Sequence, residues 1–139
     1  MRDSLILRVV SKFLIPVIIL FALYVQFHGD LGPGGAFQAG VIIASAFILH
    51  MLVFGAESTR RIVPLRLLRV LSAGGVLLYG GVGIAGVLLG GNYLEYNVLG
   101  STPTGGQHVG IILIELGVGL TVASTMILLT FTFADRAER

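Results

Sequence analysis

A chain of 139 residues that is 55% hydrophobic and only 12% charged is too apolar for a soluble domain, in which about 25% of residues are charged. The mean hydropathy of +0.97 indicates an integral membrane protein, and the absence of cysteine excludes disulfides and thiol chemistry. The net charge of +2 is the difference between nine basic and seven acidic residues. Basic residues in such a protein are typical of topology signals rather than of nucleic-acid binding.

The sequence predicts an all-α integral membrane protein with four transmembrane helices in a single domain, residues 1–139. About 20 residues cross the hydrocarbon core of a bilayer. No small-residue cleavage site follows the first apolar segment, so we expect it to be a retained helix rather than a signal peptide. The four predicted segments are Phe13–Phe27, with a start as early as Leu5, then Phe37–Phe54, Leu67–Leu89 and Val109–Phe133.

The stretch HGDLGPGGAFQAG joins the first two apolar segments and becomes the start of the second. Proline fixes one backbone dihedral and removes a donor, and glycine permits backbone conformations that other residues refuse. The stretch therefore predicts a shaped return of the chain into the bilayer, although a solvated turn explains its polar start equally well. The residues that define this loop and helix start are His28, Asp30, Pro33, Gly34, Gly35, Phe37 and Gly40.

The third apolar segment carries glycines at helical spacing, and the fourth carries Gly119 four residues before an alanine. Small residues at steps of three and four allow another backbone to approach closely. The pattern favours packing against other membrane subunits, with ordinary packing inside one bundle as the alternative. The candidate packing residues are Gly80, Gly83, Gly86, Gly90 and Gly119.

Glu115 is flanked on both sides by apolar residues of the fourth segment. A charge near the bilayer centre costs about 2.5–3.5 kcal/mol on insertion scales, so such a carboxyl is turned inward, paired or held neutral. It can serve as a proton or ion relay, or it can form a structural hydrogen bond to a neighbouring helix. His108 lies seven residues earlier on the same helix face, about 10 Å away along the axis. It is a second relay candidate, with a solvent-exposed interfacial histidine as its alternative. His50, near the end of the second segment, is a third relay candidate, with an interfacial structural role as its alternative.

The basic residues predict the orientation of the chain. They precede the first segment, lie between or beside the second and third, and follow the fourth, whereas the loops 28–35 and 90–107 contain no Lys or Arg. By the positive-inside rule, both termini are expected in the cytoplasm. The nine residues are Arg2, Arg8, Lys12, Arg60, Arg61, Arg66, Arg69, Arg136 and Arg139.

The stretch from His28 to Gly40 resembles the signature of the MnhB/MrpB-type subunits of the multisubunit Mrp/Mnh cation/proton antiporters, which runs roughly His…Pro-Gly-Gly-Gly-Phe…Gly. The third glycine of that triplet is replaced here by Ala36. The run ELGVGLTVA after Ile114 is similar to the last helix of those subunits. The resemblance covers nearly the whole chain.

The resemblance implies a multi-pass subunit, in the cell membrane, of a Na⁺ or K⁺/proton antiporter whose partners are other membrane subunits. The chain would supply packing surface and one titratable carboxyl, and no cofactor, metal site, enzyme activity or nucleic-acid partner is expected. One alternative is a self-contained small dimeric proton-coupled transporter. Another is a purely structural subunit of a related hydrogenase-type complex.

Overall fold

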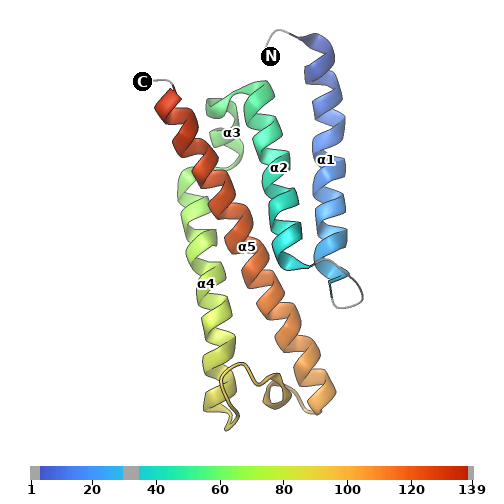
Figure 1. The fold of residues 1–139 in the computed structure, drawn as a ribbon, viewed down its shortest axis with the longest axis vertical. Coiled ribbons are helices and arrows are strands. Elements are labelled where there is room, and N and C mark those ends of the chain that lie inside the picture. Colours follow the sequence, from blue (N-terminus) through green and yellow to red (C-terminus); the bar gives the residue numbers. More distant parts are fainter. Residues whose placement is uncertain (1–3, 30–34, 138–139) are drawn as a thin grey trace.

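The computed structural model describes residues 4–29 and 35–137, and these residues are almost entirely helical. Four helices within these ranges are long and apolar enough to cross a membrane, which confirms the predicted four-helix, all-α class (Figure 1). These are α1 (Leu5–Phe27), α2 (Ala36–Phe54), α4 (Leu65–Leu88) and α5 (Pro103–Ala137). Two short elements, α3 (Ala56–Ile62) and the 3₁₀ helix η1 (Tyr96–Leu99), lie in the connections.

Helix α5 is longer than the apolar segment from which it was predicted, and α1 has the earlier of the two starts that the sequence allowed. Helix α1 begins at Leu5, where the Ser4 hydroxyl accepts a hydrogen bond from Leu7 N, and Pro16 lies inside the helix. Helix α5 has 35 residues and extends over about 50 Å at 1.5 Å per residue, well beyond a hydrocarbon core of about 30 Å. Hydropathy identifies the part of a helix that lipid can surround, but not its polar extensions.

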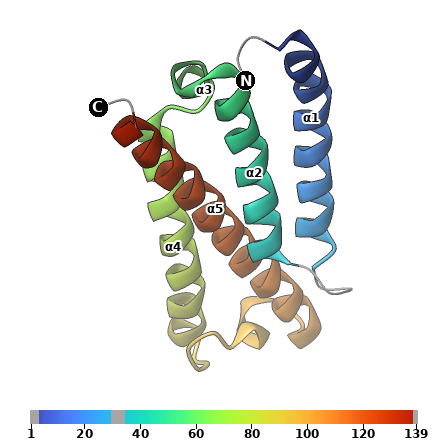
Figure 2. The ribbon, with the colours of Figure 1, turned by 45° about the horizontal axis from the view of Figure 1, so that its top comes forward.

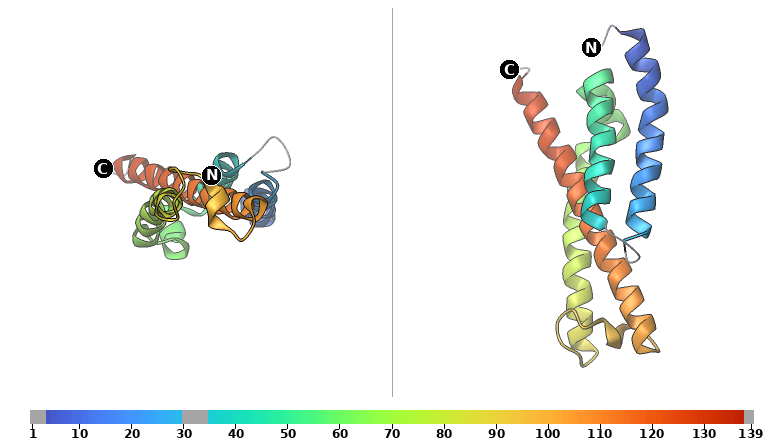
Figure 3. Two further views of the ribbon diagram at one scale, coloured as in Figure 1. Left: turned by 90° about the horizontal axis from the view of Figure 1, so that it is seen from below. Right: turned by 45° about the vertical axis from the view of Figure 1, so that its right-hand side comes forward.

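Helix α5 is the centre of the fold. It packs against α4 on one side and α2 on another, whereas α1 packs mainly on α2 and hardly contacts α5. Figures 1 and 3 show α5 crossing obliquely between α4 and α2, with α1 on the outside of the bundle. The Leu5 end of α1 and the Ala137 end of α5 lie at the same end of the molecule as α3 (Figure 2).

The hydrophobic core lies in the half of the bundle near α3. Its largest buried members are Phe131 of α5 and Leu68 of α4, which pack with Met51 of α2 and Ile127 of α5. Gly55, with a φ of 94°, makes the sharp turn between α2 and α3 that brings the two elements together, a conformation that favours glycine. Among the described residues, no side chain of α1 belongs to this core, and most apolar side chains of α1 are exposed along its whole length.

The α1–α2 pair is offset from the α4–α5 pair along the bundle axis (Figure 1). A Cβ added to Gly117 of α5 would lie 2.8 Å from the carbonyl oxygen of Gly75, which is in the middle of α4. Two residues further along α5, a Cβ on Gly119 would lie 2.6 Å from Oε1 of Gln26, at the end of α1. The ends of α1 and α2 that lie away from α3 are therefore level with the middle of α4 (Figure 1). These helix ends therefore do not lie at the level of the 90–107 loop, although the sequence loop between them and the loop that follows α4 both lack Lys and Arg.

Candidate functional site: the Glu115 recess

Glu115 lies in a recess of about 190 Å³ between α1 and α5. Gln26 and Phe27 of α1 line one side of this Glu115 recess, and His108, Ile112, Glu115 and Leu116 of α5 line the other. The structure thus brings two of the three predicted relay candidates, Glu115 and His108, to one recess. A water molecule accounts for about 30 Å³ of liquid, so this volume can hold several.

The position of Glu115 follows from the offset of the helices. It is half-buried and stands one turn from Gly119, where α5 passes the end of α1. A Cβ added to Gly29 would lie 2.8 Å from Oε1 of Glu115, and one added to Gly35 would lie 4.0 Å from the same atom. The carboxyl therefore lies against backbone at both ends of the α1–α2 connection, level with the middle of α4.

An apolar groove of about 310 Å³ continues from the recess toward α3. It shares Gln26, Phe27 and Leu116 with the recess and runs between α1, α2, α4 and α5. Ser124 is the one polar group that it adds, and its hydroxyl donates to the Leu120 carbonyl oxygen. Within the described part of the chain, the polar surface around Glu115 therefore does not continue along this groove.

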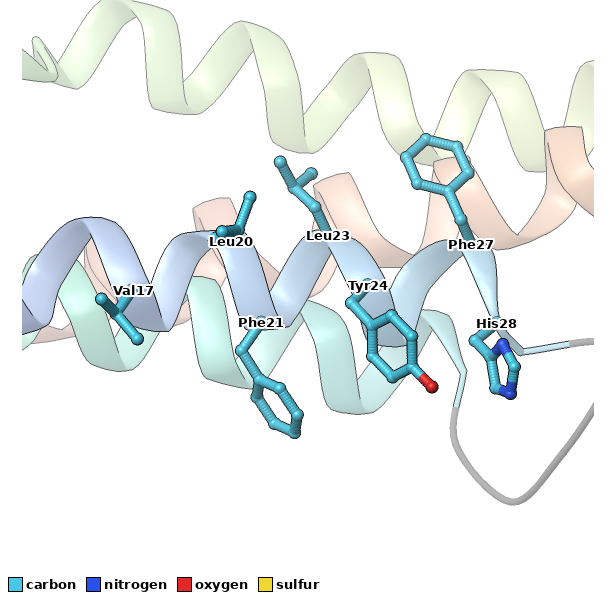
Figure 4. Close-up of a pocket in the computed structure, with 7 residues that line it drawn as sticks. All are labelled: Val17, Leu20, Phe21, Leu23, Tyr24, Phe27 and His28. Carbon is cyan, nitrogen blue, oxygen red and sulfur yellow. The ribbon is translucent and has the colours of Figure 1, made fainter.

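The first residue of the predicted loop, His28, lies apart from the Glu115 recess. His28 ends α1, with its backbone N–H donating to Tyr24 O at 3.0 Å and its ring stacked 5.0 Å from that of Tyr24. Figure 4 shows Phe21, Tyr24 and His28 along one side of α1, while Leu20, Leu23 and Phe27 project from the other. His28 does not line the Glu115 recess. Asp30, Pro33 and Gly34 lie outside the described residues.

The predicted motif residues at the start of α2 have different structural roles. Gly35 has a φ of 172°, which is extended backbone open to any residue, so the expectation of a special conformation is wrong at this position. Phe37 is exposed on the surface of α2. Gly40 permits a close helix crossing, because a Cβ there would lie 2.8 Å from the carbonyl oxygen of Gly119.

Only part of the glycine pattern in α4 can face another subunit. The ring of Tyr93 covers Gly83, and backbone of Asn92 and Glu95 covers Gly86, so the chain's own loop fills these positions. Gly90 has a φ of 90° and ends the helix, with Gly91 N donating to Gly86 O at 3.0 Å. Gly80 has nothing within 4 Å and remains open.

The loop between α4 and α5 is held by tyrosines seated on glycines. Besides Tyr93 on Gly83, the ring of Tyr96 lies over Gly110 of α5. Burial raises the pKa of the Tyr96 phenol above its ordinary value of 10, and Tyr79 and Tyr93 add to the shift, so the phenol is neutral at physiological pH. Tyrosines near the end of a transmembrane segment are typical of an interfacial belt. Here both rings pack on glycines of the chain itself, which explains their positions without contact with lipid.

His50 lies at the α3 end of α2, away from the Glu115 recess. The Thr59 hydroxyl donates its one proton to Gly55 O at 3.0 Å, so it must accept from His50 Nδ1, 2.8 Å away. The His50 ring also lies 4.7 Å from that of Phe54. These contacts fix α3 to α2 and support the structural alternative for His50.

A second polar contact at this end was missed from the sequence. Arg60 of α3 forms an ion pair with Asp135 of α5, and its guanidinium lies 5.4 Å from the centre of the Phe131 ring. The pair joins α3 to the end of the long helix. Opposite charges 75 residues apart give no local signal of such a contact.

In the described ranges, no cluster of His, Asp and Glu side chains could hold a metal ion.

Comparison with known proteins identifies the family of this chain. A family model described as "Domain related to MnhB subunit of Na+/H+ antiporter" matches residues 6–128. The chain belongs to this family. Proteins of Staphylococcus aureus strains Newman, JH1 and COL, each named "Putative antiporter subunit mnhB2", are 33% identical over 129 residues. The match covers 91% of this chain and 91% of each relative, so the resemblance seen in the sequence is confirmed.

Proposed function

We propose that this chain is a cell-membrane subunit of a multisubunit antiporter that exchanges Na⁺ or K⁺ for protons, with Glu115 as a titratable carboxyl. The family and the names of the S. aureus relatives support an antiporter subunit. The observation that carries the role of Glu115 is its place in a recess beside the α1–α2 connection, level with the middle of α4. A carboxyl at such a depth is a functional-site candidate by default.

The recess offers a route between Glu115 and the end of the bundle that carries the 90–107 loop. His108 is the sixth residue of α5, and its side chain is exposed. A proton taken up from water by the imidazole can reach Glu115 through water in the recess, because both side chains line it. His108 is thus proposed as the outer proton acceptor and Glu115 as the inner one.

The route requires another subunit on the far side of Glu115. In the described residues, the groove that leads toward α3 is apolar except for Ser124, and His50 is engaged with Thr59 in a structural contact. We therefore propose that a proton on Glu115 leaves sideways, toward polar groups that a partner supplies. This favours a part of a complex over a self-contained transporter, and reconstitution with and without partners tests it.

The charge pattern favours an orientation with both termini in the cytoplasm. The described basic residues lie toward the α3 end of the bundle, and the α4–α5 loop lies at the other. Since the chain has no cysteine, a single cysteine at Ser101 is expected to react with an impermeant thiol reagent in intact cells. A cysteine at Ser58 in α3 should react only after permeabilisation. The reverse labelling would contradict the orientation.

A further inference from the structure

The carboxyl of Glu115 occupies the space that a side chain on Gly29 would need. A Cβ at Gly29 would lie 2.8 Å from Oε1 and 3.3 Å from Cδ of Glu115. We propose that Gly29 is a positioning residue for Glu115: its bare backbone leaves room for the carboxyl and sets where it lies in the recess. This inference rests on the proposed function and assigns a role to a residue that the sequence pattern did not single out.

The carboxyl, rather than the backbone, is expected to move when a methyl group is added at Gly29. The same Cβ would lie 3.2 Å from Cα of Gly35, so backbone limits its movement on the other side. His28, just before Gly29, is held to α1 by its hydrogen bond to Tyr24 O, and α1 packs along α2. The end of the Glu115 side chain rotates at little cost, so an alanine at Gly29 should displace the carboxyl and leave the fold intact.

Gly35 supplies a matched control on the other side of the same carboxyl. Its Cβ would lie 4.0 Å from Oε1 of Glu115, an ordinary contact distance, and its extended backbone accepts any residue. Gly29→Ala and Gly35→Ala therefore add the same methyl group near the same atom. Only the methyl group at Gly29 is close enough to require Oε1 of Glu115 to move.

The test uses the complete complex reconstituted in vesicles, with cation-driven proton exchange measured across pH. Gly29→Ala is expected to lower exchange at fixed pH about tenfold, within the roughly 100-fold that a 1 Å misplacement can cost, and to shift the pH profile. Gly35→Ala should change neither. Glu115→Asp shortens the side chain and makes room for the methyl group. In the Glu115→Asp background, Gly29→Ala should therefore change exchange by less than about twofold, the tolerance expected when two sites do not interact. An equal loss in both backgrounds, or an equal loss with Gly35→Ala, would overturn the proposal.

A second readout does not depend on transport. An apolar carbodiimide modifies protonated carboxyls inside membranes, and peptide mapping reports the modification rate at Glu115. Gly29→Ala should change that rate about tenfold, since the carboxyl is displaced, and Gly35→Ala should leave it unchanged. If Glu115→Gln exchanges normally, the proposed function fails, while the labelling rates still decide whether Gly29 positions the carboxyl. An unchanged rate in Gly29→Ala would overturn the positioning role.

Discussion

Glu115→Gln is expected to lower cation/proton exchange by the assembled complex about 100-fold, the lower range for loss of a proton-transfer group. Glutamine keeps the size of the side chain and can still hydrogen-bond, but it does not take up or release a proton. The variant should therefore enter the membrane and assemble normally. The measurement is proton movement in vesicles driven by Na⁺ or K⁺ at several pH values, with the amount of complex determined separately.

Two further substitutions at Glu115 separate a titrating role from a structural one. Glu115→Asp retains an acid on a shorter stem and should keep part of the activity. If the side chain acts only as a helix–helix hydrogen bond, worth about 1 kcal/mol, glutamine should be nearly harmless and alanine should lower assembly. Wild-type exchange by the glutamine variant at every pH would remove Glu115 from the proton route.

Gly75→Ala is expected to disrupt the bundle, because α4 and α5 cross at this residue with no room for a side chain. A Cβ at Gly75 would overlap Thr121 Oγ1 and lie 2.6 Å from the Gly117 carbonyl oxygen, so the helix backbones must separate. Overpacking that shifts side chains and backbone costs about 1–3 kcal/mol, and the close approach of two helix backbones should place this change at the upper end. Thermal stability of the purified complex and its yield after extraction measure the effect.

The neighbouring Gly74 is the control, since a Cβ there meets nothing within 4 Å. Gly74→Ala should be neutral or stabilise the helix by about 0.5–1 kcal/mol, because alanine restricts the unfolded chain more than glycine does. Equal thermal stability of the two variants would contradict the close crossing at Gly75. A loss of assembly confined to Gly74→Ala would instead indicate that a partner subunit packs on that face of α4.

The helices were predictable because lipid imposes a strong local rule: about 20 apolar residues must follow one another. Their ends were less predictable: the polar first turn of α5 needs no apolar residue, and only the Ser4 cap decides between the two starts that the sequence allowed for α1. The glycines of α4 show the same limit. Spacing alone could not tell Gly83, covered by a tyrosine of the chain's own loop, from Gly80, which remains open.

Glu115 stood out in the sequence because a carboxyl among apolar residues carries a known free-energy cost. His108 stood out with it, but its neighbours on α1 did not, because they are set by the tertiary structure. Gln26 and Gly29 reach it only because the α1–α2 pair is offset toward α3 and ends at the middle of α4. No periodicity along the chain encodes that offset.

The most direct test is whether this chain supports cation/proton exchange only as a subunit of a complex or also alone. The tagged chain is purified from native membranes, and two samples are reconstituted: the material that co-purifies with it, and the chain by itself. We expect that other membrane subunits co-purify, that the complex couples Na⁺ or K⁺ gradients to proton movement, and that the lone chain does not. Robust exchange by vesicles that contain only this chain would contradict this expectation.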